Sequence, residues 1–257
     1  MAKLHILGSC SGTEPYSGCH HTALALEAKK CLYFFDAGET CSHTAHLMGL
    51  DLLKLRHIFI THPHIDHIGG LANLIWTIHK LALVKKQLEP FTLTVHASEK
   101  ALFDSALGII AAGQKNVLHF ATLFHEISPG TVFENDSLCI ECIKNNHMSL
   151  PPNGKNLSYS YRLVINGKKI IISGDVKSIN DLEPWLDDCD LLLMETGHHI
   201  ASEICTALRK SNRNVKDIVF YHHGREILND WYNALKKAED AWGGKLRFAV
   251  DGMTLTL

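Results

Sequence analysis

The stretch of the sequence with the strongest chemical signature is THPHIDHIGG, which spans residues 61–70 and follows a largely apolar run. It places three histidines and an aspartate within six positions, namely His62, His64, Asp66 and His67. Imidazole nitrogens and a carboxylate form a ligand set that suits zinc, and such crowded groups repel one another on protonation unless a metal joins them. Solvated loop histidines are the alternative. The spacing and the position after an apolar run favour a metal site.

The local sequence indicates how these side chains converge. The proline that follows His62 disfavours helical backbone at that histidine, so we expect the chain to leave the preceding strand in an extended conformation. Residues two apart point the same way in an extended chain, which would place His62, His64 and Asp66 on one side. His67 is expected at the start of the helix that follows. The two glycines after it allow the backbone to pass close to the site.

Further side chains of the metal-binding types follow three other apolar runs. His147 lies in KNNHMS after SLCIECI, Asp175 lies in SGDVKS after KKIIIS, and His222 with His223 lies in FYHHGRE after DIVFY. A single histidine at a strand end is more often a hydrogen-bonded structural residue, so each position taken alone leaves both interpretations open. A catalytic metal needs three protein ligands and an open position, and their equivalent placement therefore favours one shared site. Hydrogen bonding, packing or surface roles are expected instead for His20, His21, His43 and His46.

The elements that would hold these residues mix strands and helices throughout the chain. Strand patterns occur at KLHIL, TALALE, CLYFFD, HIFIT, TLTVH, SLCIECI, SYSYRLVI, KKIIIS, DLLLME, DIVFY and LRFAV. Helical patterns occur near 41–49, 68–86, 98–111, 178–187, 200–211 and 227–240. Groups of neighbouring strands joined by short turns, such as the hairpin signal Asn166-Gly167, precede the helices. This order favours two mixed sheets with helices outside over a doubly wound sheet.

Composition places the chain among globular proteins without a nucleic-acid or membrane signature. The 257 residues are 46% hydrophobic and carry a formal net charge of −2, which suits one domain, expected to span 1–257. The composition has no surplus of basic residues, so it does not predict a polyanionic partner. No apolar stretch has the length of a signal peptide or of a membrane span. The eight cysteines lie mostly in strand-like runs, which fits a reducing compartment. We therefore expect a cytoplasmic protein with no membrane association.

The motif HxHxDH, followed in order by a histidine, an aspartate in an SGD segment and a late histidine, resembles the metallo-β-lactamase superfamily over essentially the whole chain. This resemblance implies an α/β (α+β) protein with a four-layer αββα sandwich. It also implies two divalent metal ions, zinc first and manganese second, that polarise the oxygens of a substrate. The implied ligands are His62, His64 and His147 for the first ion, Asp66, His67 and His222 for the second, and Asp175 as the bridge.

Within the superfamily, the sequence is most similar to ribonuclease Z and its smaller phosphodiesterase relatives. LGSCSGTEP resembles their glycine-rich first turn, DAGET their DxGExT segment, SYSYRL their S-x-x-YR strand and VDGMTL their C-terminal DGM ending. Two features differ. The tRNA-processing members carry an inserted arm before the SGD segment, whereas only INGKK separates SYSYRLV from IIISGD. They also carry a HEAT segment whose histidine assists catalysis, and the equivalent position here, in LLLMETGHH, is Met194.

These observations predict a metal-dependent hydrolase, and specifically a phosphodiesterase for small or cyclic phosphodiesters or short RNA ends. The resemblance implies that Asp66 orients the attacking water. Because Met194 cannot donate a proton, the candidate donors are His198, His199 and His223, with His198 first; a surface role for His198 is the alternative. Other open functions are a thioester or lactone hydrolase on the same fold, a ribonuclease Z-type tRNA 3′-end endonuclease, and a non-catalytic metal-binding protein. Related enzymes are commonly dimers, so a homodimer is expected.

Overall fold

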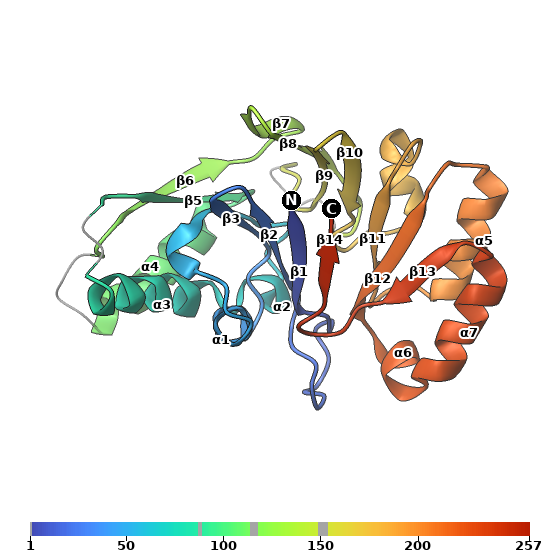
Figure 1. Cartoon of the computed structure of the whole chain (residues 1–257), viewed down its shortest axis with the longest axis horizontal. Helices are drawn as coiled ribbons and strands as arrows, with labels where there is room; N and C mark the ends of the chain where they lie inside the picture. The colour runs from blue at the N-terminus through green and yellow to red at the C-terminus, as the bar shows by residue number, and fades with distance from the viewer. Residues whose placement is uncertain (1, 87–88, 114–117, 149–153) are drawn as a thin grey trace. The chain divides into compact units, whose positions relative to one another are not determined.

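The computed structural model describes residues 2–86, 89–113, 118–148 and 154–257, and it divides into two compact units (Figure 1). Unit 1 comprises Met1–Gly8, His20–Ile127 and Asp251–Thr256, and unit 2 comprises Ser9–Cys19, Ser128–Val250 and Leu257. Each unit has its own sheet and its own helices. The assignment of 1–257 to one domain stays a prediction.

The sheet of unit 1 has seven strands. Their order is β14 (Thr254–Thr256), β1 (Lys3–Gly8), β2 (Ala23–Ala28), β3 (Cys31–Phe35), β4 (Leu55–Phe59), β5 (Thr92–Ala97) and β6 (Ala121–Glu126). The pairs from β14 to β3 are antiparallel, and those from β3 to β6 are parallel. Parallel neighbours end at the same sheet edge, so the segments after β3 and β4 emerge side by side. The motif at 61–70 is one of these two segments.

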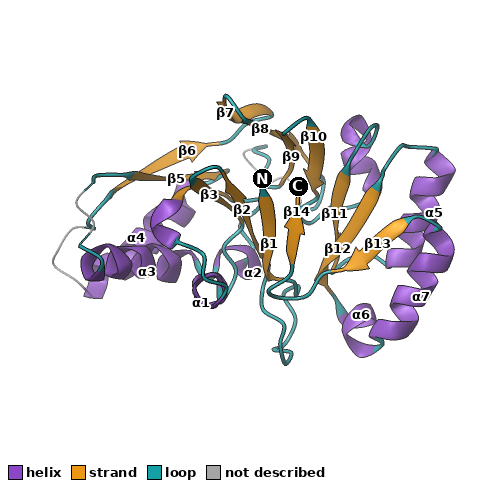
Figure 2. Ribbon diagram, in the orientation of Figure 1, coloured by secondary structure: helices purple, strands orange, loops and turns teal. Residues whose placement is uncertain are grey.

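Helices cover one face of this sheet (Figure 2). They are α1 (Cys41–Leu47), the 3₁₀ turn η1 (Leu52–Lys54), α2 (Ile65–Ile68), α3 (Leu71–Val84) and α4 (Lys100–Gly113). Leu74 and Ile78 on α3 are fully buried in the same apolar cluster as Phe34 and Ile58 of the strands. Burial of such side chains contributes on the order of 2 kcal/mol each, and it fixes the start of α3 directly after the motif.

The sheet of unit 2 also has seven strands. Their order is β13 (Lys245–Phe248), β12 (Asp217–His223), β11 (Leu191–Thr196), β10 (Lys168–Ile172), β9 (Tyr159–Ile165), β8 (Leu138–Lys144) and β7 (Gly130–Asn135). The four strands from β10 to β13 are parallel, and the pairs from β10 to β7 are antiparallel. The segments after β10, β11 and β12 therefore leave the same edge. Asp175 and His198 lie on the segments after β10 and β11, and His222 and His223 are the last residues of β12 at the same edge.

Four helical segments pack on one face of this second sheet. They are the 3₁₀ helix η2 (Ile179–Trp185), α5 (Ala201–Ser211), α6 (Arg225–Asn229) and α7 (Trp231–Trp242). Ile204 and Leu208 of α5 and Ala238 of α7 are buried in one cluster with Leu192 and Phe220 of the strands. The apolar positions on α5 recur at a spacing of three or four residues, as a one-sided buried helix requires.

The predicted architecture of two mixed sheets with flanking helices is confirmed. The Asn166-Gly167 hairpin is also confirmed, since both residues have positive φ, 52° and 76°, between β9 and β10. Three strands have no counterpart in the sequence prediction, namely β6, β7 and β14. The first two are edge strands with mostly exposed or half-buried side chains, and β14 has three residues, so none has a strong hydrophobic pattern.

The backbone of the motif differs in one respect from the expected conformation. The extended run ends at His64, and the short helix α2 starts at Ile65. Asp66 therefore lies on α2 together with His67, and the expectation that Asp66 continues the extended run with His62 was wrong. A separate helix, α3, starts at Leu71 after the Gly69–Gly70 turn.

Helix length bears on membrane association. The longest helices of the described chain, α3 and α4, have 14 residues each, whereas a membrane span needs about 20 apolar residues. Among the described residues, no helix has the length and hydropathy to cross a membrane. The cytoplasmic location stays a prediction.

Candidate metal centre

In unit 1, the four motif side chains form two close pairs. His62 Nε2 lies 2.9 Å from His64 Nδ1, and His67 Nε2 lies 3.5 Å from Asp66 Oδ2. His62 and His67 are fully buried and Asp66 nearly so, whereas His64 is exposed. Imidazoles and a carboxylate that are buried at these distances are in contact with little water, and such groups are suitable metal ligands. The structure thus brings the four candidate ligands of the motif together within this unit, in a group that we call the ligand group.

The carboxylate of Asp36, at the end of β3, orients two of these histidines. Its Oδ2 accepts a hydrogen bond from His67 Nδ1 at 2.7 Å and another from the Thr61 hydroxyl at 2.9 Å. The Thr61 oxygen in turn lies 3.0 Å from His62 Nδ1 and can accept its proton. With both Nδ1 atoms protonated, the Nε2 atoms of His62 and His67 keep their lone pairs for a metal. Sequence reasoning missed this role, although the aspartate of DAGET is the last residue of the predicted strand CLYFFD.

In unit 2, Asp175 lies between two histidines. Its Oδ2 is 3.6 Å from His147 Nε2, and its Oδ1 is 3.2 Å from His222 Nε2. Asp175 and His222 are almost completely buried, and His147 is half-buried. The structure therefore brings together three candidate ligands that the sequence placed at strand ends. The Asp175 carboxylate thus has one imidazole near each of its two oxygens.

Two glycines give the backbone of this group its shape. Gly174, just before Asp175, has φ of 56°, and its N–H donates to the Tyr221 hydroxyl at 3.1 Å. A Cβ atom on Gly197 would approach His222 Cδ2 to 2.6 Å and its Nε2 to 2.9 Å. The turn after β11 thus packs directly against the His222 ring. Only a residue without a side chain allows this approach.

Glu195, at the end of β11, holds the two histidines that follow it. The carboxylate is fully buried, its Oε2 accepts the backbone N–H of His198 at 2.9 Å, and its Oε1 lies 3.2 Å from His198 Nδ1. His199 Nε2 lies 2.9 Å from the carbonyl oxygen of Val176 and can donate to it. His198 Nδ1 is also 3.7 Å from Asp175 Oδ2, and its side chain is 46% exposed. His198 therefore lies beside Asp175 with a large part of its ring exposed to solvent.

His223 has a different environment from its neighbour His222. It is fully buried, its Nε2–H donates to the carbonyl of Ala249 at 2.9 Å, and its Nδ1 lies 2.9 Å from the Thr196 hydroxyl. Burial lowers the pKa of His223 to about 4. Both ring nitrogens are engaged inside unit 2, so His223 is built into the end of the sheet.

The donor sets fit divalent metal ions in both units. Unit 1 offers imidazole nitrogens and one carboxylate, and unit 2 offers the Asp175 carboxylate with His222 Nε2 at 3.2 Å and His147 Nε2 at 3.6 Å. Nitrogen with carboxylate oxygen is a donor chemistry that suits zinc and also accepts manganese. The buried carboxylates would gain charge compensation from a cation. Clusters able to bind metal are thus present where the sequence predicted them.

Comparison with known proteins identifies a family and a fold for this chain. A family model, described as "Anti-Pycsar protein Apyc1", matches residues 2–237. The chain belongs to this Apyc1 family. A curated relative, ribonuclease Z of Borrelia recurrentis (strain A1), is 21% identical over 309 aligned positions that cover 98% of this chain and 96% of the relative. The predicted similarity to the ribonuclease Z-like branch is confirmed.

Solved structures identify the fold that this Apyc1 family member shares. The metallo-beta-lactamase fold protein YhfI from Bacillus subtilis has a TM-score of 0.77 at 15% identity, covering 99% of this chain and 98% of that one. The short form of human tRNase Z has a TM-score of 0.74 at 19% identity, covering 99% and 98%. Unliganded yeast PDE1 has a TM-score of 0.67 at 16% identity, covering 100% and 99%. The predicted metallo-β-lactamase fold is confirmed.

Proposed function

We propose that this Apyc1 family member is a dinuclear metal phosphodiesterase that hydrolyses small or cyclic phosphodiesters or short RNA ends. The observation that carries the proposal is the position of Asp175, whose two oxygens face different histidines, His147 at 3.6 Å and His222 at 3.2 Å. A carboxylate placed in this way can hold two cations at a fixed spacing and offset their charge. Two-metal sites of this kind are typical of phosphoryl-transfer hydrolases.

The order of the motifs along the chain supports two ligand sets. The proposed ligands are His62, His64 and His147 for one ion, Asp66, His67 and His222 for the other, and Asp175 for both. Inside unit 1, the close pairs His62–His64 and Asp66–His67 divide in the same way. Zinc is the metal that we propose first and manganese the second, because imidazole with carboxylate suits both.

The proposed chemistry assigns one task to each residue. Two bound divalent ions supply positive charge for the nonbridging phosphate oxygens and an activated nucleophile at neutral pH. Asp66 orients the attacking water. His198 is held at Nδ1 by Glu195, at 3.2 Å, and so presents Nε2 for proton transfer to the leaving alkoxide. We do not propose His223 as the donor, because both of its ring nitrogens are engaged in unit 2.

The link between β9 and β10 supports a small substrate. The tRNA-processing enzymes that the sequence resembles carry an inserted arm at this place, whereas a turn at Asn166-Gly167 joins the two strands in this chain. Contacts far from the reacting bond orient a large substrate, and their loss lowers the rate as well as the affinity. A small phosphodiester does not depend on such contacts.

Metal content and a substrate panel test the proposal. After reconstitution with zinc or manganese, elemental analysis should find about two ions per chain. Bis(p-nitrophenyl) phosphate and cyclic nucleotides should be hydrolysed faster than a thioester or a lactone. Asp175→Asn should lose both metal and activity, whereas Asp104→Asn, an exposed position on α4, should keep both. One ion per chain, or faster cleavage of the thioester or lactone, would overturn the assignment.

We also propose that the protein is a homodimer, as related enzymes commonly are. The substrate is proposed to be its main binding partner, either a small phosphodiester or a short RNA. Sedimentation equilibrium of the purified chain measures the assembly directly, and a monomer mass at micromolar concentration would contradict the dimer.

A further inference from the structure

Two candidate ligands of unit 2 follow strands that are not neighbours in the sheet. His147 comes after β8 and Asp175 after β10, and β9 lies between these two strands. Both run antiparallel to β9, so they end at the same sheet edge. Adjacent strands are about 4.8 Å apart, which separates the two backbones by roughly 10 Å. The side chains nevertheless approach to 3.6 Å, from His147 Nε2 to Asp175 Oδ2.

A buried serine of β9 connects the two segments from inside the sheet. Ser160 Oγ accepts a hydrogen bond from Asn145 Nδ2 at 3.1 Å and donates one to the Ser173 carbonyl at 2.5 Å. Asn145 Oδ1 accepts the backbone N–H of His147 at 3.2 Å. Ser173 stands two positions before Asp175. One hydroxyl thus joins the backbone of both ligands, and we call the contacts of Asn145, Ser160 and Ser173 the inner brace.

A carboxylate of the 3₁₀ helix η2 connects the same two segments from a more exposed position. Asp181 Oδ2 accepts the backbone N–H of Asn146 at 3.2 Å and that of Lys177 at 2.9 Å. Its Oδ1 accepts the side-chain N–H of Asn146 at 2.5 Å. Asn146 directly precedes His147, and Lys177 stands two positions after Asp175. We call these contacts of Asp181 the outer brace.

The two braces resist displacement for different physical reasons. Asn145, Ser160 and Ser173 are at most 1% exposed, so a hydrogen bond broken there leaves a buried polar atom without a partner. The outer brace consists of hydrogen bonds to a carboxylate, which are roughly twice as strong as bonds between neutral groups. Together they hold the two segments on either side of β9 at one separation.

This separation matters because metal coordination is exacting. Zinc binds imidazole nitrogen and carboxylate oxygen at about 2.0–2.2 Å, and ligands must lie within roughly 0.5 Å of the productive geometry. His147 and Asp175 come from different segments, so no local backbone geometry ensures their distance. The braces are the contacts that join these segments at residues next to the ligands or two positions away.

We propose that Ser160 and Asp181 are positioning residues that set the spacing between His147 and Asp175 for the one ion that both would bind. The proposal rests on the dinuclear site proposed above and names two residues that bind no metal and yet determine the affinity for one of its ions. Removal of groups that orient metal ligands typically lowers metal affinity 10–100-fold. The other ion, assigned to Asp66, His67 and His222 with the bridge, does not use His147.

Two variants, each altering one brace, test the proposal. Asp181→Asn keeps the size of the side chain, but its amide nitrogen cannot accept the N–H groups that the carboxylate accepts. Asp181 is half-buried, so this variant tests the role with little effect on the packed interior. Ser160→Ala removes the hydroxyl of the inner brace. Asp240→Asn, at an exposed position on α7, is the matched control for Asp181→Asn.

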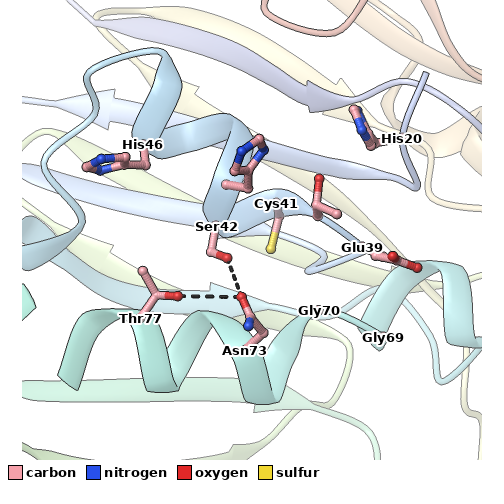
Figure 3. A pocket seen from close by; sticks show the side chains of 11 residues that line it. His20, Glu39, Cys41, Ser42, His46, Gly69, Gly70, Asn73 and Thr77 are labelled. Atoms are coloured by element: carbon pink, nitrogen blue, oxygen red, sulfur yellow. Dashed lines mark hydrogen bonds between the residues drawn. The ribbon is translucent and has the colours of Figure 1, made fainter. Parts of the chain in front are cut away.

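Ser42 provides the matched control for the loss of a buried hydroxyl. It donates to Asn73 Oδ1 at 2.6 Å in the wall of a cavity of unit 1 (Figure 3). Neither of these residues belongs to the ligand group of that unit. Ser42→Ala therefore removes a buried hydrogen bond without removing a contact of a brace, and it separates a general loss of stability from a specific loss of metal affinity.

Titration of each apoprotein with Co²⁺, followed by calorimetry and visible absorption, gives a readout that does not depend on hydrolysis. The wild type, Asp240→Asn and Ser42→Ala should bind two ions with the same affinities and spectra. Asp181→Asn and Ser160→Ala should each bind one ion as the wild type does and the other about 10–100-fold more weakly, with an altered spectrum for that ion.

The outcomes separate this role from the proposed function. If the wild type binds two ions and a folded variant binds both with wild-type affinity and spectrum, the positioning role of that residue is refuted and the dinuclear function stands. If the wild type binds a single ion whose affinity falls in both variants, the dinuclear function fails and the positioning role stands. If the wild type binds no ion, both are overturned.

Discussion

The carboxylate of Asp36 lies 2.7 Å from Nδ1 of His67, and both side chains are buried. This hydrogen bond holds the proton on Nδ1 and leaves Nε2 for a metal. Asp36→Asn keeps the size of the side chain but offers a weaker acceptor, so metal affinity should fall roughly 10–100-fold. Metal titration by calorimetry measures the change. Asp104→Asn serves as the control, and an Asp36→Asn protein with wild-type affinity would show that this contact does not orient the ligand.

Gly197 allows the His222 ring to approach the turn after β11. A methyl group at this position would lie 2.6 Å from His222 Cδ2, so Gly197→Ala should displace the imidazole and lower activity roughly 10²-fold. Activity and metal content of the folded variant provide the measurement. Gly108→Ala on α4 is the matched control, because a Cβ atom there meets nothing within 4 Å. Equal activity of the two variants would contradict the proposed role of the turn.

A row of histidines in unit 1 predicts a pH-dependent stability. His57 Nδ1 lies 3.0 Å from His96 Nε2, and His96 Nδ1 lies 3.2 Å from Nδ1 of the exposed His125. Burial lowers the pKa of His57 to about 4, with a smaller contribution from Arg56, and burial with the neighbouring histidines lowers the pKa of His96 to about 3. Both imidazoles are therefore neutral in the folded protein at neutral pH.

The sign of the effect follows from proton binding. Below about pH 6.5 the unfolded chain protonates these two histidines and the folded chain does not, so stability falls as the pH drops from about 6.5 towards 4. His96→Gln removes one of these groups. Between pH 7 and pH 5, the free energy of unfolding of the variant should therefore fall by on the order of 1–2 kcal/mol less than that of the wild type. Urea unfolding at both pH values measures this difference. Identical pH dependence in the variant and the wild type would refute the assignment to His96.

The proposed proton donor can be tested by the choice of leaving group. His198→Ala should lower the rate roughly 10²–10⁴-fold on an ester with a poor alkoxide leaving group, because that group needs a proton. Release of p-nitrophenolate, a good leaving group, should be largely kept, and so should the metal content. His199→Ala is the comparison, since its Nε2 is bonded to the Val176 carbonyl, and it should affect both substrates alike. If His198→Ala hydrolyses both substrates at the rates of the wild type, the proton has another source.

The turn between β9 and β10 predicts a preference for small substrates. Wild-type protein should cleave bis(p-nitrophenyl) phosphate or a cyclic nucleotide with a higher kcat/KM than a precursor tRNA, because no arm is present to orient the tRNA. Steady-state rates on both substrates, with gel analysis of the tRNA products, give the comparison. Efficient trimming of the tRNA at one position would favour the ribonuclease Z-type alternative.

The sequence by itself determined the types of the ligand residues and the strands that carry most of them. His62, His64 and His67 stand in one short motif, and the spacing of a motif depends only on local chain geometry. The strands before Asp175 and His222 were predictable because buried parallel strands are continuous apolar runs, which are visible in the residues themselves. The start of α2 was not predictable, because a helix of one turn has too few residues for a periodic hydrophobic pattern.

Only the tertiary structure decided which partners these residues have. Asp36 accepts the hydrogen bond of His67 because β3 pairs with β4. No local sequence pattern predicts which strands become neighbours. His222 and His223 are adjacent in the chain, yet one faces Asp175 and the other is enclosed by Thr196 and Ala249. Side-chain hydrogen bonds reach only about 3 Å, so they depend on strand order and on burial, and both arise when each sheet buries its apolar face under its own helices.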